Sequence, residues 1–331
     1  MRSNHEFRSS FAPEFKMFLD EKRACGNKYI EEERLMHKLD EICVSHNRID
    51  GLTKELVLKF ASPHPNWSQG TYEKHMSLAA QIAKFMNNHG VKAYIPDTKL
   101  RLDNYRSFSP YIFRIDEIKM IFSKADSLPP GKKNDRSRDF YPVVFRLLYS
   151  SGLRISEALR LTMKDVDFDN RTIFINSGKN HKDRLLPLNQ HMMPYLEFYA
   201  DKYHKTFKND DYFFMPPHGG GHYDKGTVYQ RFRKIIFECG LSHGGREKGG
   251  PRLHCLRHTF CVHSLRQFLV NDIDFRVAIP ILSVYMGHSS ISATGKYLRL
   301  TAEAYPEISA KMEKEFGKLI PEWEVSKNET D

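Results

Sequence analysis

Six residues of this 331-residue chain could take part in chemistry: Arg154, Lys179, His254, Arg257, His288 and Tyr297. Each of them, taken singly, also has an ordinary structural role. Arg154 could pair with Glu157 one helical turn away, and Lys179 could simply lie in a solvated turn. His254 and His258 are four residues apart, a spacing that puts both on one face of a helix and would suit zinc. The sequence has neither an HExxH pattern nor a third ligand at a recognisable spacing, so a metal hydrolase is the least favoured interpretation.

The six residues belong to four segments, which follow one another as SGLRISEALRL, SGKNHKDRLLPL, LHCLRHTF and YMGHSSISATGKYL. This succession resembles the motifs of the tyrosine recombinase family, also called phage-integrase-type or Xer-like recombinases. In that family an arginine begins a helix after a turn of small residues, and an acidic residue follows three positions later, as Arg154 and Glu157 do. The nucleophilic tyrosine follows the histidine of a Gly-His pair by nine residues, which matches His288 and Tyr297.

The resemblance also assigns the middle of the set. An HxxR pair matches His254 and Arg257, and a lysine in a β-hairpin turn matches Lys179. Lys182 is the alternative for that lysine, because a one-residue difference in the turn would exchange the two. The interval from Arg257 to the Gly-His pair is longer than is usual in the family, because VNDIDFRVAIP adds residues. We expect a longer loop or helix there and no loss of activity, since the motifs on both sides are intact.

These residue types suit the cleavage of a phosphodiester. The phosphate carries negative charge that spreads further over its oxygens in the transition state. Two guanidinium groups, Arg154 and Arg257, can each offer paired donors to the non-bridging oxygens. Such a clamp makes a metal unnecessary, and we expect no cofactor. Tyr297 would attack the phosphorus and form a phosphotyrosine.

The resemblance implies the remaining roles. Lys179 gives a proton to the departing 5′ oxygen, His254 is the general acid or base on the tyrosine side, and His288 donates a hydrogen bond to the phosphate, with Glu157 orienting its neighbours. The predicted function is a site-specific DNA recombinase or integrase that cleaves and rejoins strands through a 3′-phosphotyrosyl intermediate. A type IB topoisomerase-like enzyme and a catalytically silent DNA-binding protein of the same fold are the alternatives. The biological task stays open among integration and excision of a mobile element, dimer resolution and inversion.

Periodicity indicates the elements that hold these residues. Residues 1–95 are predicted to form helices that begin near residues 11, 29, 53 and 68. Residues 96–112 contain two prolines and no sustained periodicity, which predicts a linker, and residues 113–331 form the second predicted domain. In that region two strands, Thr172 to Ile175 and Asp183 to Pro187, flank the turn SGKNHK. Most of the remainder is predicted to be helical, so the predicted fold is mainly α with one small antiparallel β-sheet.

The family resemblance implies an N-terminal helical core-binding domain and an α+β catalytic domain that close around double-stranded DNA. It further implies that two copies bind inverted half-sites and that two such dimers form a tetramer. We do not expect a separate arm-binding domain ahead of the first helix. The C-terminal helix would dock on the neighbouring copy through an apolar stripe with four-residue spacing, namely Ile308, Met312, Phe316 and Ile320. A helix packed on its own domain is the alternative.

Composition indicates an ordinary globular protein with a basic charge balance, which is typical of proteins that bind a polyanion but is also found in basic proteins that bind none. The formal net charge is +10 and the isoelectric point is about 9.2, a balance that attracts nucleic acid. The chain has no apolar run long enough to cross a membrane and no apolar N-terminal segment of the secretory kind. We therefore expect a cytoplasmic, nucleoid-associated protein. The five cysteines form no CxxC pair and are predicted to be reduced thiols.

Overall fold

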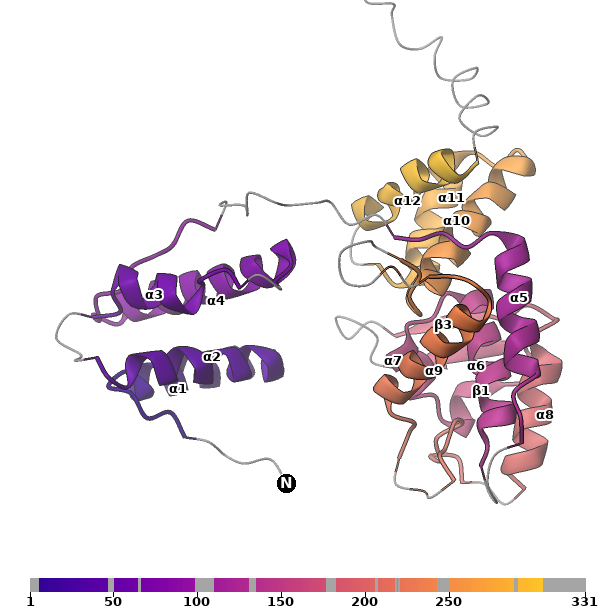
Figure 1. Ribbon diagram of the computed structural model, residues 1–331, viewed down its shortest axis with the longest axis horizontal. Helices are drawn as coiled ribbons and strands as arrows, with labels where there is room; N and C mark the ends of the chain where they lie inside the picture. Colours follow the sequence, from indigo (N-terminus) through magenta and orange to yellow (C-terminus); the bar gives the residue numbers. More distant parts are fainter. Residues whose placement is uncertain are drawn as a thin grey trace, which may run out of the picture. The chain divides into compact units, whose positions relative to one another are not determined.

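The computed structural model describes residues 6–46, 51–64, 67–98, 110–130, 135–176, 183–205, 208–217, 219, 221–242, 244, 250–288 and 291–305. The chain divides into two compact units, Met1–Ser107 and Phe108–Asp331 (Figure 1). The division falls within residues 96–112, for which the sequence predicts a linker. Each unit has its own buried cores, so each is described by itself.

The first unit contains the four predicted helices: α1 (Ala12–Ala24), α2 (Ile30–Cys43), α3 (Lys54–Phe60) and α4 (Gln69–Asn88). Two of them begin at residues whose hydroxyls cap the helix, as Thr53 accepts from the backbone N–H of Leu56 and Ser68 from that of Thr71. Their apolar faces meet in one main core, in which the largest buried side chains are Phe11, Phe15, Phe18 and Met36.

The second unit holds the motif residues. Its first helices are α5 (Ile115–Asp126), α6 (Ser137–Ser151), the short α7 (Ile155–Ala158) and the 3₁₀ turn η2 (Met163–Asp165). The strands β1 (Val166–Asp167), β2 (Thr172–Ile175) and β3 (Arg184–Pro187) follow, and then α8 (Met193–Tyr203) and α9 (Lys225–Glu238). The chain continues with α10 (Cys255–Val270), α11 (Phe275–Met286) and α12 (Ile291–Ala304).

The sheet is antiparallel with strand order β1-β2-β3. β2 and β3 pair from Thr172 with Pro187 to Ile175 with Arg184, which confirms the predicted hairpin strands. Ile173 and Ile175 point into the core and alternate with the half-exposed Phe174, the pattern of a strand with one buried face. The fold class predicted from the sequence is therefore confirmed, although β1 was not predicted.

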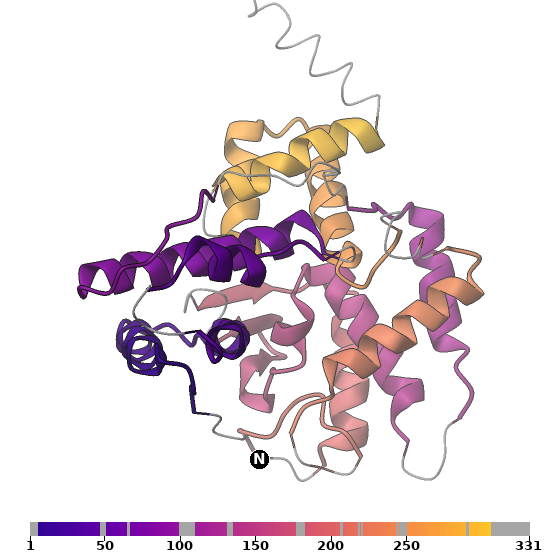
Figure 2. The same cartoon turned by 60° about the vertical axis from the view of Figure 1, so that its left-hand side comes forward.

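Helices α10, α11 and α12 form one end of the second unit, drawn in orange and yellow in Figures 1 and 2. They enclose a separate small core that includes Val262, Leu265, Leu282 and Leu300. The long interval between Arg257 and the Gly-His pair is helical over most of its length, because α10 continues to Val270 and α11 begins only four residues after Asn271. Among the described helices, none combines the length and the apolar content that crossing a membrane requires. All five cysteines are free thiols.

Candidate active site

Arg154 lies at a sharp turn between α6 and α7. Gly152 is the C-cap residue of α6, and its left-handed backbone (φ 60°) turns the chain. Arg154 is the N-cap residue of α7. A Cβ atom at Gly152 would lie 2.4 Å from Cδ1 of Phe260 and 2.8 Å from Sδ of Met286. The absence of a side chain at this position therefore lets the turn approach both α10 and α11.

Glu157 fixes the position of Arg154. Its Oε2 accepts the backbone N–H of Arg154 at 2.9 Å, and its Oε1 accepts Nη1 of the same residue at 2.7 Å. Arg184 of β3 donates to both oxygens, at 2.9 and 3.2 Å. Burial alone would raise the pKa of Glu157, but the hydrogen bonds from Arg184 and the Arg154 backbone, with the charges of both arginines, lower that pKa to about 2. The carboxylate is therefore ionised at neutral pH and holds two arginines in place.

Arg257 ties α10 to the same turn. Its side chain is buried, Nη1 donates to the carbonyl oxygen of Gly152 at 2.5 Å, and Nη2 donates to that of Met286 at 2.7 Å. Burial and the nearby charge of Arg154 lower the pKa of Arg257 to about 10, which leaves the guanidinium charged at neutral pH. Two cations thus lie close enough to repel each other, and a bound anion would relieve that repulsion.

His288 follows Gly287, the C-cap residue of α11, which has a left-handed backbone (φ 61°). Its Nδ1 lies 2.7 Å from Oγ1 of Thr294, a fully buried residue of α12. The carbonyl oxygen of Gly287 accepts a long hydrogen bond of 3.4 Å from Nη2 of Arg154. The Gly-His segment therefore contacts both the first arginine and the helix that carries the tyrosine.

Tyr297 lies on α12 with only 2% of its surface exposed. Its hydroxyl oxygen is 2.8 Å from Nδ1 of His258. Its ring is nearly parallel to that of His288, with an angle of 6° and centroids 6.0 Å apart. Burial raises the pKa of Tyr297 and Cys261 adds to this effect, whereas the charges of the two motif arginines lower it. The phenol is therefore protonated at neutral pH and lies in the field of both cations.

The structure places five of the six predicted site residues. Lys179 lies outside the described residues, as does its alternative, Lys182. His254 is exposed at the N-cap of α10, and its ring is 4.7 Å from that of His258, at 84°. Hydrogen bonds, ring contacts and electrostatic interactions bring together the four others, namely Arg154, Arg257, His288 and Tyr297.

Three residues at this site were not predicted: Arg184, His258 and Thr294. Arg184 also donates from Nε to the carbonyl oxygen of Tyr285 at 3.1 Å, so it links the sheet, α7 and α11. Its pairing depends on tertiary contacts that its own segment does not reveal. The sequence offered a signal for Thr294, which precedes Tyr297 by three residues and so shares its helix face. His258 was considered only as a zinc ligand, although it directly follows Arg257.

The structure offers no support for zinc at these histidines. Among the described residues no group of three or more His, Cys, Asp or Glu side chains is arranged to hold a metal ion. His258 contacts the tyrosine hydroxyl instead, and His254 contacts the ring of His258.

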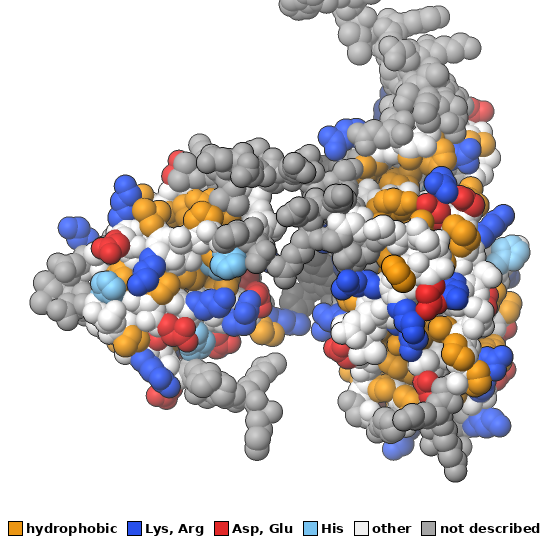
Figure 3. All heavy atoms as spheres, viewed as in Figure 1, with side chains coloured by type: hydrophobic (Ala, Val, Ile, Leu, Met, Phe, Trp, Pro, Cys, Tyr) orange, Lys and Arg blue, Asp and Glu red, His pale blue; other side chains and the backbone are white. Residues whose placement is uncertain are grey.

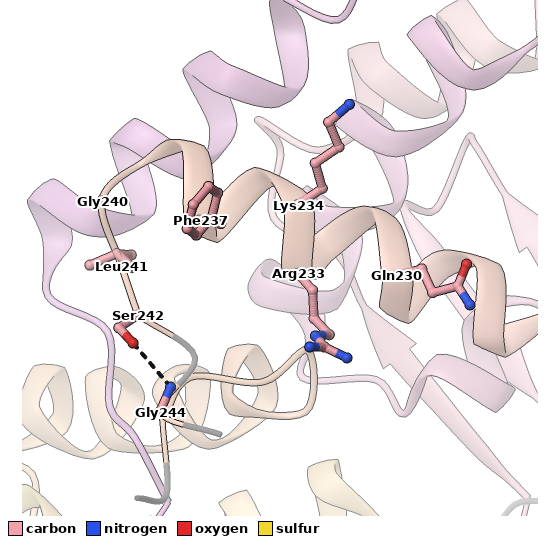
Figure 4. Close-up of a pocket in the computed structure, with 8 residues that line it drawn as sticks. All are labelled: Gln230, Arg233, Lys234, Phe237, Gly240, Leu241, Ser242 and Gly244. Atoms are coloured by element: carbon pink, nitrogen blue, oxygen red, sulfur yellow. Dashed lines mark hydrogen bonds between the residues drawn. The ribbon is translucent and has the colours of Figure 1, made fainter. Parts of the chain in front are cut away.

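A surface pocket of about 540 Å³ lies elsewhere, between α9 and the segment of residues 240–242 and 244. Figure 4 shows Arg233 and Lys234 extending from α9 in different directions, while Phe237 lies near Leu241. Phe237 is 77% exposed, so the pocket is an open, partly basic depression. None of the residues that gather around Tyr297 lines it.

Comparison with known proteins agrees with these motifs. Residues 112–304 match the phage integrase family. A putative integrase/recombinase, y4rB, of Sinorhizobium fredii (strain NBRC 101917 / NGR234) is 26% identical over 309 residues, which are 92% of this chain and 98% of that protein. A tyrosine recombinase of Pseudothermotoga lettingae (strain ATCC BAA-301 / DSM 14385 / NBRC 107922 / TMO) is 32% identical over 250 residues, covering 75% of this chain and 76% of that protein.

Solved structures share the fold at low identity. The Tn1549 transposon integrase in complex with a circular intermediate DNA has a TM-score of 0.62 at 20% identity, covering 89% of this chain and 98% of that chain. A lambda integrase dimer bound to a COC′ core site has a TM-score of 0.61 at 14% identity, covering 85% of this chain and 94% of that chain. The family match spans more than half of the sequence and includes every described residue of the site, so this chain belongs to the phage integrase family of tyrosine recombinases.

Proposed function

We propose that this chain is a site-specific DNA recombinase that cleaves and rejoins strands through a 3′-phosphotyrosyl intermediate. The observation that carries the proposal is the convergence of two arginines on one buried tyrosine. The charges of Arg154 and Arg257 both act on Tyr297, and both arginines are fixed by hydrogen bonds around the Gly152 turn. A fixed pair of guanidinium groups beside a hydroxyl is an arrangement that suits a phosphodiester and its transition state.

In the proposed reaction, Arg154 and Arg257 hold the non-bridging oxygens of the scissile phosphate. Tyr297 attacks the phosphorus, the bond to the 5′ oxygen breaks, and the 3′ end stays on the tyrosine. Lys179 supplies the proton that the 5′ oxygen needs, and His288 donates a hydrogen bond to the phosphate. Because the phosphotyrosine retains the energy of the broken bond, a 5′ hydroxyl from another duplex can rejoin the strand without ATP.

Two further residues complete the proposed set. His254 is the general acid or base on the tyrosine side, which its ring contact with His258 supports, because His258 in turn contacts the tyrosine hydroxyl. Glu157 orients Arg154 and is a supporting residue. The proposed chemistry uses no metal ion and no cofactor.

The proposed partner is double-stranded DNA with inverted half-sites. The net charge of +10 supports a polyanion, and Figure 3 shows basic side chains on the viewed face of both units, interspersed with acidic ones. The first unit would bind the core site and the second would act on the phosphate. The DNA-bound dimer reported for lambda integrase supports a dimer on each site, and we extend this to a tetramer of two dimers in the cytoplasm at the nucleoid. The apolar stripe proposed to dock on the neighbour, residues 308–320, lies outside the described residues.

Tyr297→Phe tests this function, because it removes the nucleophilic oxygen and leaves the cationic pocket. The substrate is a nicked suicide duplex carrying the site recovered from recombined junctions in host DNA. The unaltered protein is expected to become covalently attached in the presence of EDTA, whereas the variant binds the duplex in a gel shift and stays unattached. A covalent product from the variant would show that the nucleophile is wrong, and Tyr285 or Tyr305 would be tested next. Two sites on one plasmid should yield recombinants; relaxed plasmid without recombinants would instead indicate a topoisomerase.

A further inference from the structure

The hydroxyl of Tyr297 is paired with a histidine that none of the motif assignments uses. We propose that His258 is a further catalytic residue, which takes the phenol proton as Tyr297 attacks the phosphate. This inference rests on the proposed function and deepens it, because it assigns the proton that strand cleavage must remove from the nucleophile.

The geometry fits a general base. Nδ1 of His258 lies 2.8 Å from the tyrosine hydroxyl oxygen, within the range for direct proton transfer. The two rings have centroids 5.6 Å apart and an angle of 40°. Both side chains are buried, at 8% and 2% exposure, so α10 and α12 hold the pair away from bulk water. The role requires Nδ1 to accept, with the ring hydrogen on Nε2.

The nucleophile needs such a base. Burial favours the neutral phenol of Tyr297, and the arginine charges oppose this effect without reversing it. A neutral phenol that bonds to phosphorus must lose its proton in the same step or just before it. His258 is within hydrogen-bond distance of the atom that carries this proton. The ring of His254, at the exposed start of α10, packs nearly perpendicular to the ring of His258. Any acid or base role of His254 would therefore act through His258.

Each proton that moves in this step has a donor and an acceptor. The O–H bond of Tyr297 breaks and an N–H bond forms at Nδ1 of His258, while the phenolate electron pair forms the new bond to phosphorus. The bond from phosphorus to the 5′ oxygen breaks, and that oxygen receives its proton from Lys179 in the proposed reaction. During rejoining, a 5′ hydroxyl gives its proton to Lys179 and bonds to phosphorus, the bond from phosphorus to the Tyr297 oxygen breaks, and His258 returns the proton to the phenolate.

His258→Gln tests the base, because an amide can keep a hydrogen bond to Tyr297 but does not take its proton. Formation of the covalent complex on the suicide duplex is expected to slow by about 10²-fold, the usual contribution of a general base. Replacing Tyr297 in this variant with 3,5-difluorotyrosine, whose phenol is more acidic, should raise the rate of covalent-complex formation by about tenfold or more. A more acidic phenol loses its proton more readily and depends less on a base. A substrate with sulfur at the bridging 5′ position should give no such recovery, because His258 does not serve the leaving group.

The same helix offers a matched control. His263 of α10 pairs through Nδ1 with the hydroxyl of Tyr149 at 2.9 Å, so His263→Gln removes a histidine–tyrosine pair that lies outside the proposed reaction. This control is expected to cleave within about threefold of the unaltered protein. Gel shift and thermal unfolding of both variants report binding and folding, so a loss of cleavage with normal binding is assigned to the chemical step.

Several outcomes would overturn the inference. If His258→Gln cleaves within about threefold of the unaltered protein, His258 is not the base. If the slow cleavage of this variant persists with difluorotyrosine at position 297, His258 is a structural partner of the tyrosine only. If the variant does not fold, difluorotyrosine at position 297 of the protein that retains His258 provides the test. With a base present, this replacement should change the rate of covalent-complex formation by less than about threefold. A rise of about tenfold or more would mean that no base takes the proton. Absence of any covalent complex with the unaltered protein would instead overturn the proposed function.

Discussion

The carboxylate of Glu157 holds two arginines that come from different parts of the chain. It pairs with Arg154 of the α6–α7 turn at 2.7 Å and with Arg184 of β3 at 2.9 Å, while its side chain is only 7% exposed. A buried carboxylate is costly unless its oxygens are fully hydrogen-bonded, and here they accept four hydrogen bonds from the two arginines. Removing the charge would leave two partly buried cations without their anion.

Acid should therefore weaken the protein through Glu157. The pKa of this group is lowered from 4.5 in the unfolded chain to about 2 in the folded one, so its stabilisation is fully present above about pH 4.5 and is lost as the pH falls toward 2. The shift corresponds to about 3 kcal/mol. Urea unfolding measures this effect. Between pH 6 and pH 2 the free energy of unfolding should fall by about 3 kcal/mol more in the unaltered protein than in Glu157→Gln. Parallel curves for the two proteins would contradict the assigned pKa.

Arg154→Lys and Arg257→Lys keep the charge and lose the paired donors. Cleavage of the suicide duplex is expected to fall by about 10²-fold or more in each, the scale of losing one donor to a transition-state oxyanion. DNA binding should change much less, because many other cations contribute to it. Single-turnover cleavage and gel shifts measure the two effects separately. Cleavage close to that of the unaltered protein in both variants would remove the arginine clamp from the mechanism.

The turn between α6 and α7 depends on Gly152 twice, once for its backbone and once for the space around it. Gly152→Ala is expected to destabilise the protein by about 2 to 4 kcal/mol, combining the cost of a left-handed alanine with that of an overpacked contact to Phe260. Cleavage should fall too, because the Gly152 carbonyl oxygen accepts from Arg257. Urea unfolding and single-turnover cleavage measure the two effects.

Gly240 provides the matched control for this substitution. It also has a left-handed backbone (φ 74°), but a Cβ atom there would meet nothing within 4 Å. Gly240→Ala should therefore cost only about 1 kcal/mol. Equal losses of stability in the two variants would show that packing against α10 and α11 does not restrict Gly152.

Secondary structure was predictable where one side-chain pattern dominates a segment. The alternation in Thr172–Ile175 gave β2 with its observed bounds, whereas β1 has only two residues, Val166–Asp167, and lies in a stretch rich in turn formers. α12 was predicted only as part of a mainly helical region, without bounds of its own. Its helix is stabilised by burial against α10 and α11, through residues such as Leu300, which is a tertiary effect that local propensity does not contain.

The candidate site likewise contains residues that the sequence predicts and residues that it does not. Arg154, Arg257, His288 and Tyr297 could be predicted because each lies in a short motif with fixed spacing. The partner of the tyrosine hydroxyl could not, because the pairing of His258 with Tyr297 depends on how α10 packs against α12. The same holds for Arg184, whose ion pair joins residues 27 positions apart.

The two compact units divide the chain into parts with separate cores. Phe11, Phe15 and Phe18 belong to the core of the first unit, and Phe113 and Phe145 to that of the second. Near the start of the second unit, the backbone N–H of the fully buried Phe113 donates to Oγ1 of Thr259 on α10 at 3.0 Å. A fragment that begins at residue 108 therefore retains the contact that fixes its N-terminal segment to α10, the helix that carries Arg257.

Residues 108–331 produced alone should fold and keep the chemistry but lose affinity. All described side chains around Tyr297 belong to this unit, so single-turnover cleavage at saturating duplex should stay within about threefold of the whole chain. Affinity should fall by about tenfold or more, and its dependence on salt should become shallower, because the cations of residues 1–107 no longer release counterions from the DNA. Gel shifts from about 50 to 200 mM salt measure both quantities, with Tyr297→Phe in the fragment as the control for covalent attachment. A fragment that binds as tightly and as salt-dependently as the whole chain would exclude the first unit as a DNA-binding domain, while a folded fragment that binds but does not cleave would mean that the first unit contributes to the active site.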